Sequence, residues 1–453
     1  MKNETNLREK EDSQISLRQK IAYGSGAAGG NVVSSLAAAF LLSYYTDTAL
    51  IGAAAIGTMF FLTRLLDGFT DLLMGSVVDK TNTRIGKARP WLIVAAPLVC
   101  IGMILLLNVP AGWDGTGKLV YAYITYTFLM SISYTIFGIA HAALLARMTR
   151  NAQERNNTSV VSGICNGVSG LVVGTAMTAL VMNLGWTATS VILGIVAGAL
   201  ILIPGLAVKE TVGMMETGLA KNEVLPLKQQ LPAALKNKYF YLALMISALT
   251  LIMNANAIAA QIYYCNVVLG RPEFMMQLMF WGQFPGIVIL FVMPWFTKRF
   301  SKQAFMALGT ALLTLGFAIM GLSGGNTSVI LLGSILRTIG TGPIFAGSYA
   351  LIADACDYGE WKTGIRSEGL FAASSSIGAK VGIGVGSGLT GWFLAIFDYN
   401  PTLAVQTERT IFGITFAFSW FGAIIGVLLF VVILLMNVEK YLPQIRKDLI
   451  EGR

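Results

Sequence analysis

The feature that most constrains this chain is a succession of apolar stretches, each about 20 residues or longer, separated by short polar segments. A stretch of that length is what an α-helix needs to cross the hydrocarbon core of a bilayer. Only 12% of the residues are charged, which is about half the share found in soluble proteins. We therefore predict an all-α polytopic membrane protein, since the strand alternation of a membrane barrel is absent from the sequence.

The apolar pattern predicts twelve transmembrane helices, arranged as two halves of six. The expected spans are 21–46, 52–78, 91–109, 119–146, 159–183, 187–208, 239–268, 275–297, 303–323, 327–353, 368–397 and 410–436. Between spans six and seven the chain turns polar, which indicates a linker between two bundles. The expected parts are a tail at 1–20, a bundle at 21–208, the linker at 209–238, a bundle at 239–436 and a tail at 437–453.

The basic residues test the orientation of these spans. Of the 32 Lys and Arg residues, 26 fall in the tails and in loops on the side of the N-terminus. The opposite loops hold only Lys118, Arg271 and Arg409. This asymmetry predicts that both termini are cytoplasmic, and it accounts for the net charge of +9. Membrane lipid is therefore the expected partner of these residues, and nucleic acid is not.

Residues 1–20 are polar and of mixed charge. They lack the apolar core and the small-residue cleavage site of a secretory signal, so we expect no part of this segment to be removed. The sequence also shows no phosphate-binding loop, nucleophile elbow or metal-ligand cluster. We therefore expect a protein that is not an enzyme and that holds no cofactor.

Charged residues on the second predicted span are the strongest functional signal. Arg64, Asp67 and Asp71 follow the spacing i, i+3, i+7 and so share one helix face. A charge at bilayer depth costs about 2.5–3.5 kcal/mol on insertion scales, and such residues usually mark an ion or substrate path. Burial favours the protonated carboxyl and a nearby cation favours the ionised one, so the pair can load and release a cation. The structural alternative is a buried charge network that only holds helices together.

Other polar residues inside predicted spans are candidates for substrate binding. Tyr134, Gly138 and His141 share a face of span four, although a packed imidazole is the alternative for His141, the only histidine. Lys380 lies at the centre of span eleven, on the same span as a further candidate, Ser376. Arg337 in span ten either neutralises an acidic substrate or pairs with a carboxylate, and the sequence leaves both readings open.

Four motifs resemble one transporter family over nearly the whole chain. They are YYTD at 44–47, TRLLDGFTD at 63–71, GKARPW at 86–91 and DYGEWKTGIRSEG at 357–369. The sequence is similar to the glycoside–pentoside–hexuronide:cation symporters of the major facilitator superfamily. This resemblance implies the major facilitator fold and transport of a glycoside together with a cation. It also implies a bacterial cytoplasmic (inner) membrane protein, which we expect to be a monomer.

The resemblance also assigns roles to residues. Asp67 and Asp71 match the acidic pair that serves cation coupling in the melibiose carriers, and Thr135 matches a threonine of that cation site. Tyr134 falls in the same cavity and Lys380 matches a lysine of helix eleven. Asn31, Gly138 and Ser162 replace two acidic residues and a sugar-binding arginine. Losing a carboxylate weakens a sodium site, because a hard cation needs several oxygen ligands, so we favour a proton.

Further segments are similar to the bacterial glucuronide carriers of this family, namely LLSYYTD at 41–47, GAAA at 52–55, VD at 78–79, NTR at 82–84 and GKLVYAY at 117–123. That branch also has an asparagine like Asn31, and a neutral residue there would not repel an anionic sugar. We therefore expect symport of a glycoside, with a glucuronide favoured, and a proton. The candidate substrate-binding residues are Asn31, Arg64, Tyr134, Gly138, His141, Arg337, Ser376 and Lys380.

The sequence leaves two alternatives open. One is a sodium-coupled symporter of neutral glycosides, with Na⁺ held at Asp67 and Asp71. The other is a membrane sugar sensor that does not transport, which the short tails and the missing signalling domain disfavour.

Overall fold

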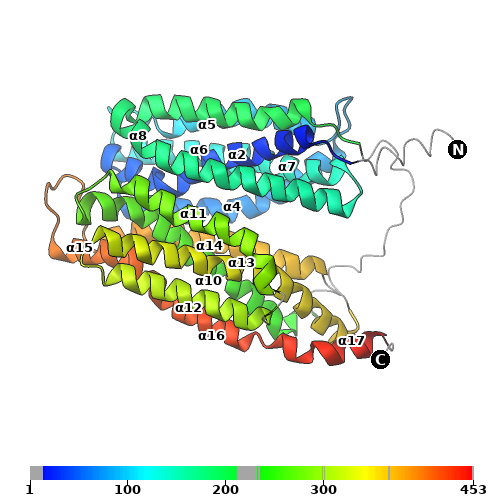
Figure 1. The fold of residues 1–453 in the computed structure, drawn as a ribbon. Helices are drawn as coiled ribbons and strands as arrows, with labels where there is room; N and C mark the ends of the chain where they lie inside the picture. Colours follow the sequence, from blue (N-terminus) through cyan, green and yellow to red (C-terminus); the bar gives the residue numbers. More distant parts are fainter. Residues whose placement is uncertain are drawn as a thin grey trace. The chain divides into compact units, whose positions relative to one another are not determined.

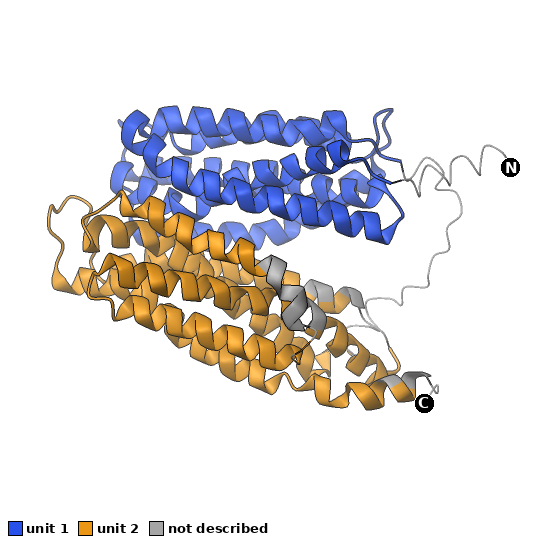
Figure 2. Ribbon diagram, viewed as in Figure 1, with its two compact units in different colours: residues 1–220 blue, residues 221–453 orange. Residues whose placement is uncertain are grey.

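The computed structural model describes the backbone of residues 14–211, 232, 235–297, 299, 301–365 and 368–450. Within helices it leaves out the side chains at 290–297, 349–350, 368–369, 372–373, 446 and 449–450. The chain divides into two compact units, unit 1 (Met1–Ala220) and unit 2 (Lys221–Arg453), which Figures 1 and 2 show in sequence colours and unit colours. The division falls inside the expected linker, most of which lies outside the described residues.

Unit 1 consists of helices that run alongside one another (Figure 1). They are α2 (Leu17–Ala39), α3 (Leu41–Ser43), the π-helical turn η1 (Tyr44–Thr48), α4 (Ala53–Lys80), α5 (Arg89–Leu106), α6 (Gly115–Thr127), the π-helical turn η2 (Phe128–Tyr134), α7 (Thr135–Met148) and α8 (Ala152–Ala207). The longest, α8, has 56 residues and is kinked at Gly185, where φ is 75°. A positive φ is readily available only to glycine, and this kink lies between expected spans five and six.

Unit 2 is helical as well. Its elements are α10 (Lys238–Tyr263), η3 (Tyr264–Val268), α11 (Phe274–Thr297), α12 (Lys302–Gly321), α13 (Thr327–Thr363), α14 (Glu368–Ile396), α15 (Glu408–Thr415), η4 (Phe416–Trp420), α16 (Phe421–Leu435), η5 (Val438–Tyr441) and α17 (Leu442–Ile450). The described residues contain no β-strand, only an isolated bridge between Thr83 and Gly86. The all-α prediction is therefore confirmed. The expected tail at 437–453 contains η5 and α17.

Eight of the described helices are long and apolar enough to cross a membrane, or nine if the bent pair Leu17–Ala39 and Leu41–Thr48 is one span. Helix α4 is not among them because of its charged residues, although its 28 residues extend about 42 Å. Each expected span nevertheless coincides with a described helix. The number twelve stays a prediction, because neither α4 nor α11 is among these helices, and α8 counts as one helix where two spans are expected.

The same helix pairings occur in both units. In unit 1, α2 packs against α8, and α8 also packs against α5; in unit 2, α10 packs against α14 and α12 against α16. Gly378 and Gly382 of α14 explain one of these contacts. A Cβ added at Gly378 or Gly382 would lie 2.7 or 2.6 Å from the carbonyl oxygens of Leu244 and Ala248 on α10. Such small residues let helix backbones approach closely in lipid.

A glutamate caps an equivalent helix start in each unit. The carboxylate of Glu210 accepts hydrogen bonds from the backbone N–H groups of Lys87, Ala88 and Arg89 at 2.9, 2.8 and 3.0 Å, at the start of α5. The carboxylate of Glu439 accepts from the N–H groups of Lys302 and the next residue at 2.9 and 3.1 Å, at the start of α12. Negative charge at a helix start satisfies unpaired N–H groups and complements the helix dipole.

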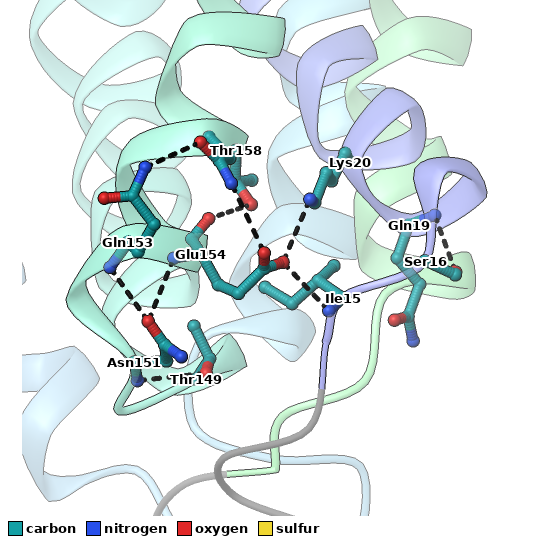
Figure 3. A network of polar contacts seen from close by, with 10 residues as sticks. Ile15, Ser16, Gln19, Lys20, Thr149, Asn151, Gln153, Glu154 and Thr158 are labelled. Carbon is teal, nitrogen blue, oxygen red and sulfur yellow. Dashed lines mark hydrogen bonds and ion pairs between the residues drawn. The ribbon is translucent and has the colours of Figure 1, made fainter.

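A second polar cluster joins α2 to α8 near their N-terminal ends, and Figure 3 shows it from close by. The carboxylate of Glu154 pairs with the Lys20 ammonium at 2.9 Å and accepts a 3.1 Å hydrogen bond from the N–H of Ile15. The Asn151 side chain caps α8 by accepting from the N–H groups of Gln153 and Glu154. The cluster fixes where α2 begins.

Candidate functional site

The expected acidic pair lies halfway along α4. Asp67 is the fifteenth of the 28 residues of this helix, so it lies about 21 Å from the first residue along the axis. The α4 face around it is mixed. Asp67 and Thr63 are buried, whereas Leu66 and Phe69 beside them are exposed. This distribution is typical of a helix that shows an apolar side to lipid and a polar side to the protein interior.

Both carboxylate oxygens of Asp67 are engaged. Oδ2 receives a hydrogen bond from Nη1 of Arg64 at 2.9 Å, one turn earlier on the same helix. Oδ1 receives a 2.5 Å hydrogen bond from the hydroxyl of Ser131. The side chain of Asp67 is only 8% exposed and that of Arg64 20% exposed. Charge-assisted hydrogen bonds of this kind are roughly twice as strong as those between neutral groups.

Asp71 has the same kind of partner one turn further along. The hydroxyl of Thr135 donates a 3.1 Å hydrogen bond to Oδ1 of Asp71, which is half-buried. Ser131 lies in η2 and Thr135 begins α7, so the four-residue spacing of the two hydroxyls matches the four-residue spacing of the two carboxylates. The structure thus brings together the three expected coupling residues, Asp67, Asp71 and Thr135, within unit 1.

Ser131 is a member of this site that the sequence interpretation missed. Serine is common in membrane helices, and nothing in its immediate neighbourhood marks it. The signal available was its position four residues before Thr135, since residues at i and i+4 share a helix face.

The expected substrate-binding residues of unit 1 form a second polar group, on α2 and its neighbours. The hydroxyl of Tyr134 shares a 2.9 Å hydrogen bond with that of Ser34. Asn31 donates to Oδ1 of Asn166 on α8 at 3.0 Å, and its own Oδ1 accepts from Ser35 at 2.9 Å. Amide and hydroxyl groups that are partly exposed and arranged in this way can exchange their partners for sugar hydroxyls.

His141 and Gly138 have different surroundings. The His141 ring stacks on that of Tyr23, with centroids 4.1 Å apart and an interplanar angle of 13°. Its Nε2 lies 2.9 Å from the Tyr23 carbonyl oxygen, and the Tyr23 hydroxyl donates to the His141 carbonyl at 3.2 Å. These contacts join α2 to α7. At Gly138, by contrast, an added Cβ would meet no atom within 4 Å, so this face of α7 borders open space.

Three expected residues belong to unit 2. Arg337 on α13 is buried, and its Nη1 has no hydrogen-bond partner among the described residues. On α14, Ser376 is exposed and Lys380 is half-buried, with an interaction of its own. The described residues contain no group of three or more His, Cys, Asp or Glu side chains that could hold a metal ion.

Comparison with known proteins identifies the family. A family model described as MFS/sugar transport protein matches residues 22–440. The glucuronide carrier protein homolog of Escherichia coli (strain K12) is 30% identical, with 89% of this chain and 88% of the relative covered. The isoprimeverose transporter of Lactiplantibacillus pentosus is 27% identical, with 95% and 91% covered.

A solved structure supports the fold. The crystal structure of a D-xylose-proton symporter has a TM-score of 0.64 and 13% identity, and the match covers 92% of this chain and 96% of that one. At this identity the likeness concerns the fold alone, and the fold is that of a major facilitator transporter. The family model and the relatives describe transporters. The chain is therefore a multi-pass membrane transporter and not an enzyme. The chain belongs to the MFS/sugar transport family, whose members include sugar:cation symporters of the major facilitator superfamily.

Proposed function

We propose that this sugar symporter moves a glycoside, with a glucuronide favoured, together with a proton across the bacterial cytoplasmic membrane. Support for the substrate comes from the glucuronide carrier homolog among the relatives and from the neutral Asn31. A carboxylate at that position would repel an anionic sugar.

The proton proposal rests on the observation that both carboxylate oxygens of Asp67 accept hydrogen bonds from protein side chains. Arg64 and Ser131 hold one oxygen each, at 2.9 and 2.5 Å. A proton arriving at Asp67 removes the negative charge that holds Arg64, and the guanidinium is then available to donate hydrogen bonds to another acceptor. Donation from Arg64 to the hydroxyl oxygens of the sugar would stabilise the protonated state of Asp67. The two binding events thereby favour each other through one shared cation, which is thermodynamic coupling between sites.

Asp71 and Thr135 complete this machinery. Their hydrogen bond of 3.1 Å holds the Asp71 carboxylate one helical turn from Asp67 on α4. In the proposed cycle the pair holds one proton when the transporter is loaded and none when it returns empty.

Flux measurements in proteoliposomes test this proposal directly. An imposed pH gradient should drive accumulation of an aryl glucuronide, and a sodium gradient at constant pH should not. Asp67→Asn should lose accumulation and keep exchange of internal for external substrate, because exchange needs no net proton movement. Full accumulation by the variant would refute the role of Asp67.

The isoprimeverose transporter among the relatives supports a neutral glycoside as the cargo of a second candidate function, for which we propose sodium as the coupling ion. In that case Asp67, Asp71 and Thr135 would supply oxygen ligands to Na⁺. Uptake that follows the sodium gradient, with a neutral glycoside preferred over its glucuronide, would establish this candidate instead.

A further inference from the structure

Arg337 on α13 is a buried charged residue inside a predicted membrane span. It is the eleventh residue of a helix that starts at Thr327, so it lies about 15 Å from that end, near the middle of a hydrocarbon core about 30 Å thick. Arg337 is only 7% exposed, and Nη1 of its guanidinium is buried without a hydrogen-bond partner among the described residues. Removing one partner of a buried pair is among the costliest changes a protein can suffer, so a buried guanidinium without an anion calls for an explanation.

The neighbours of Arg337 offset only part of that cost. The guanidinium lies over the ring of Phe317 on α12, with 5.5 Å between Cζ and the ring centroid. A cation–π contact at this distance supplies attraction and no hydrogen-bond acceptor. A second buried polar group without a hydrogen-bond partner lies one turn away. It is the hydroxyl of Ser334, which has no partner in the described part of the chain. Ser334 and Arg337 are at i and i+3 and share a face of α13.

Gly282 of α11 faces these two groups. A Cβ built at Gly282 would lie 3.3 Å from the Ser334 hydroxyl and 3.7 Å from Nη2 of Arg337. Gly282 is itself partly exposed. The absence of a side chain here leaves the hydroxyl and the guanidinium facing the same small space, which a methyl group would occupy.

We propose that Arg337, Ser334 and the space at Gly282 form a carboxylate subsite that selects anionic glycosides. The planar guanidinium donates a pair of N–H groups that match the two oxygens of a carboxylate, and the serine hydroxyl donates a further hydrogen bond. This inference deepens the proposed function, on which it rests for the glucuronide substrate, and it names the residue that discriminates a uronic acid from the matching neutral sugar.

Paired substrates test the assignment. An aryl β-glucuronide and the aryl β-glucoside differ only in a carboxylate against a hydroxymethyl group. For Arg337→Gln we expect KM for the glucuronide to rise about 10- to 100-fold, the loss typical of a charged hydrogen-bond partner, with KM for the glucoside unchanged. Arg337→Lys should recover part of the preference, since it keeps the charge and loses the fork.

Two glycines of α11 provide a matched pair of variants. Gly282→Ala should weaken glucuronide binding because its methyl fills the space before Ser334 and Arg337. Gly286→Ala adds the same methyl one turn away, 3.1 Å from Cγ2 of Thr338, and should leave the preference intact. Equal effects of the two substitutions on both substrates would show that helix packing alone is responsible, and would overturn the subsite.

Thermal unfolding of the purified protein separates a binding role from a structural one. Without substrate, Arg337→Gln should melt at the wild-type temperature or above it, because it removes an unpaired buried charge. An aryl glucuronide should raise the melting temperature of the wild type and not that of the variant. A lower melting temperature of the unliganded variant, or no glucuronide effect on the wild type, would overturn the inference.

These readouts also distinguish its failure from that of the proposed function. Glucuronide uptake that is indifferent to Arg337→Gln removes the subsite and leaves the transport function standing. A glucuronide-induced melting shift that needs Arg337, without glucuronide uptake, keeps the subsite and removes the proposed cargo.

Discussion

Ser131 follows Asp67 by 64 positions and donates a 2.5 Å hydrogen bond to its carboxylate. The same offset joins Thr135 to Asp71. Two contacts with one offset mean that α4 and the η2–α7 segment run parallel in a fixed register, with hydroxyls facing carboxylates at both levels. The parallel packing of these two segments therefore gives each of the two carboxylates a hydroxyl donor.

Removing the hydroxyl of Ser131 should impair coupling more than folding. Ser131→Ala leaves Oδ1 of Asp67 without its donor, at a cost of about 1–3 kcal/mol for a buried charged acceptor, and we expect the gradient-driven accumulation ratio to fall about tenfold. Ser133→Ala is the matched control, because that hydroxyl also lies in η2 but donates to the carbonyl of Phe128. Accumulation measured in proteoliposomes should be normal in the control. Equal losses in both variants would argue against a specific role for Ser131.

The Arg64–Asp67 pair predicts a non-additive double mutant. Arg64→Gln leaves a carboxylate that is 8% exposed without its cation, which should destabilise the protein by about 3 kcal/mol. Adding Asp67→Asn should recover most of this loss, because the remaining amides are neutral. Unfolding in detergent of the wild type, both single variants and the double variant gives the coupling energy. Additive effects would show that the two side chains do not depend on each other.

Glu210 predicts a stability effect distant from the transport site. Its carboxylate accepts three backbone N–H groups at the start of α5, so Glu210→Gln should lower stability by about 1–2 kcal/mol. Glu439→Gln should do the same in unit 2, where two N–H groups lose their charged acceptor. Melting temperatures in detergent measure both effects. Substrate KM should change in neither variant, and a large change in KM would assign these residues another role.

Gly138 predicts a change of coupling ion. Because a Cβ at this position meets no atom within 4 Å, the Gly138→Asp variant should fold. It would add a carboxylate on α7, the helix of Thr135, to the two carboxylates on α4. Additional oxygen ligands favour a hard cation, so uptake by this variant should respond to sodium, measured at constant pH. Gly138→Asn is the control that fills the same space without charge. A sodium response in the asparagine variant would show that size, not charge, is decisive.

The features that depend on residues near one another in the sequence could be predicted. The length of the apolar stretches predicted an all-helical membrane protein, and spacing placed Asp67 and Asp71 on one face of α4, whereas motif resemblance supplied Thr135. Prediction failed where contacts depend on how distant segments meet. The stacking of His141 on Tyr23 joins residues 118 positions apart, and no local pattern announces such a pair.

The lack of a hydrogen-bond partner for Nη1 of Arg337 among the described residues could not be predicted either. The sequence left open whether this arginine meets a substrate or a carboxylate of the protein. Only the positions of α11 and α12 show that its neighbours are Gly282 and the ring of Phe317, neither of which offers a side-chain acceptor.

The π-helical turn η2 affects how α7, which follows it directly, is oriented about the helix axis. It spans Phe128–Tyr134, contains Ser131 and ends directly before Thr135, the first residue of α7, and a π turn holds one residue more than an α turn. Deleting a single residue between 132 and 134 would convert the π turn into an α turn, so α7 would keep its angular phase. Ser131 and Thr135 would still face Asp67 and Asp71, which means that η2 can absorb a length change of one residue without loss of either hydrogen bond.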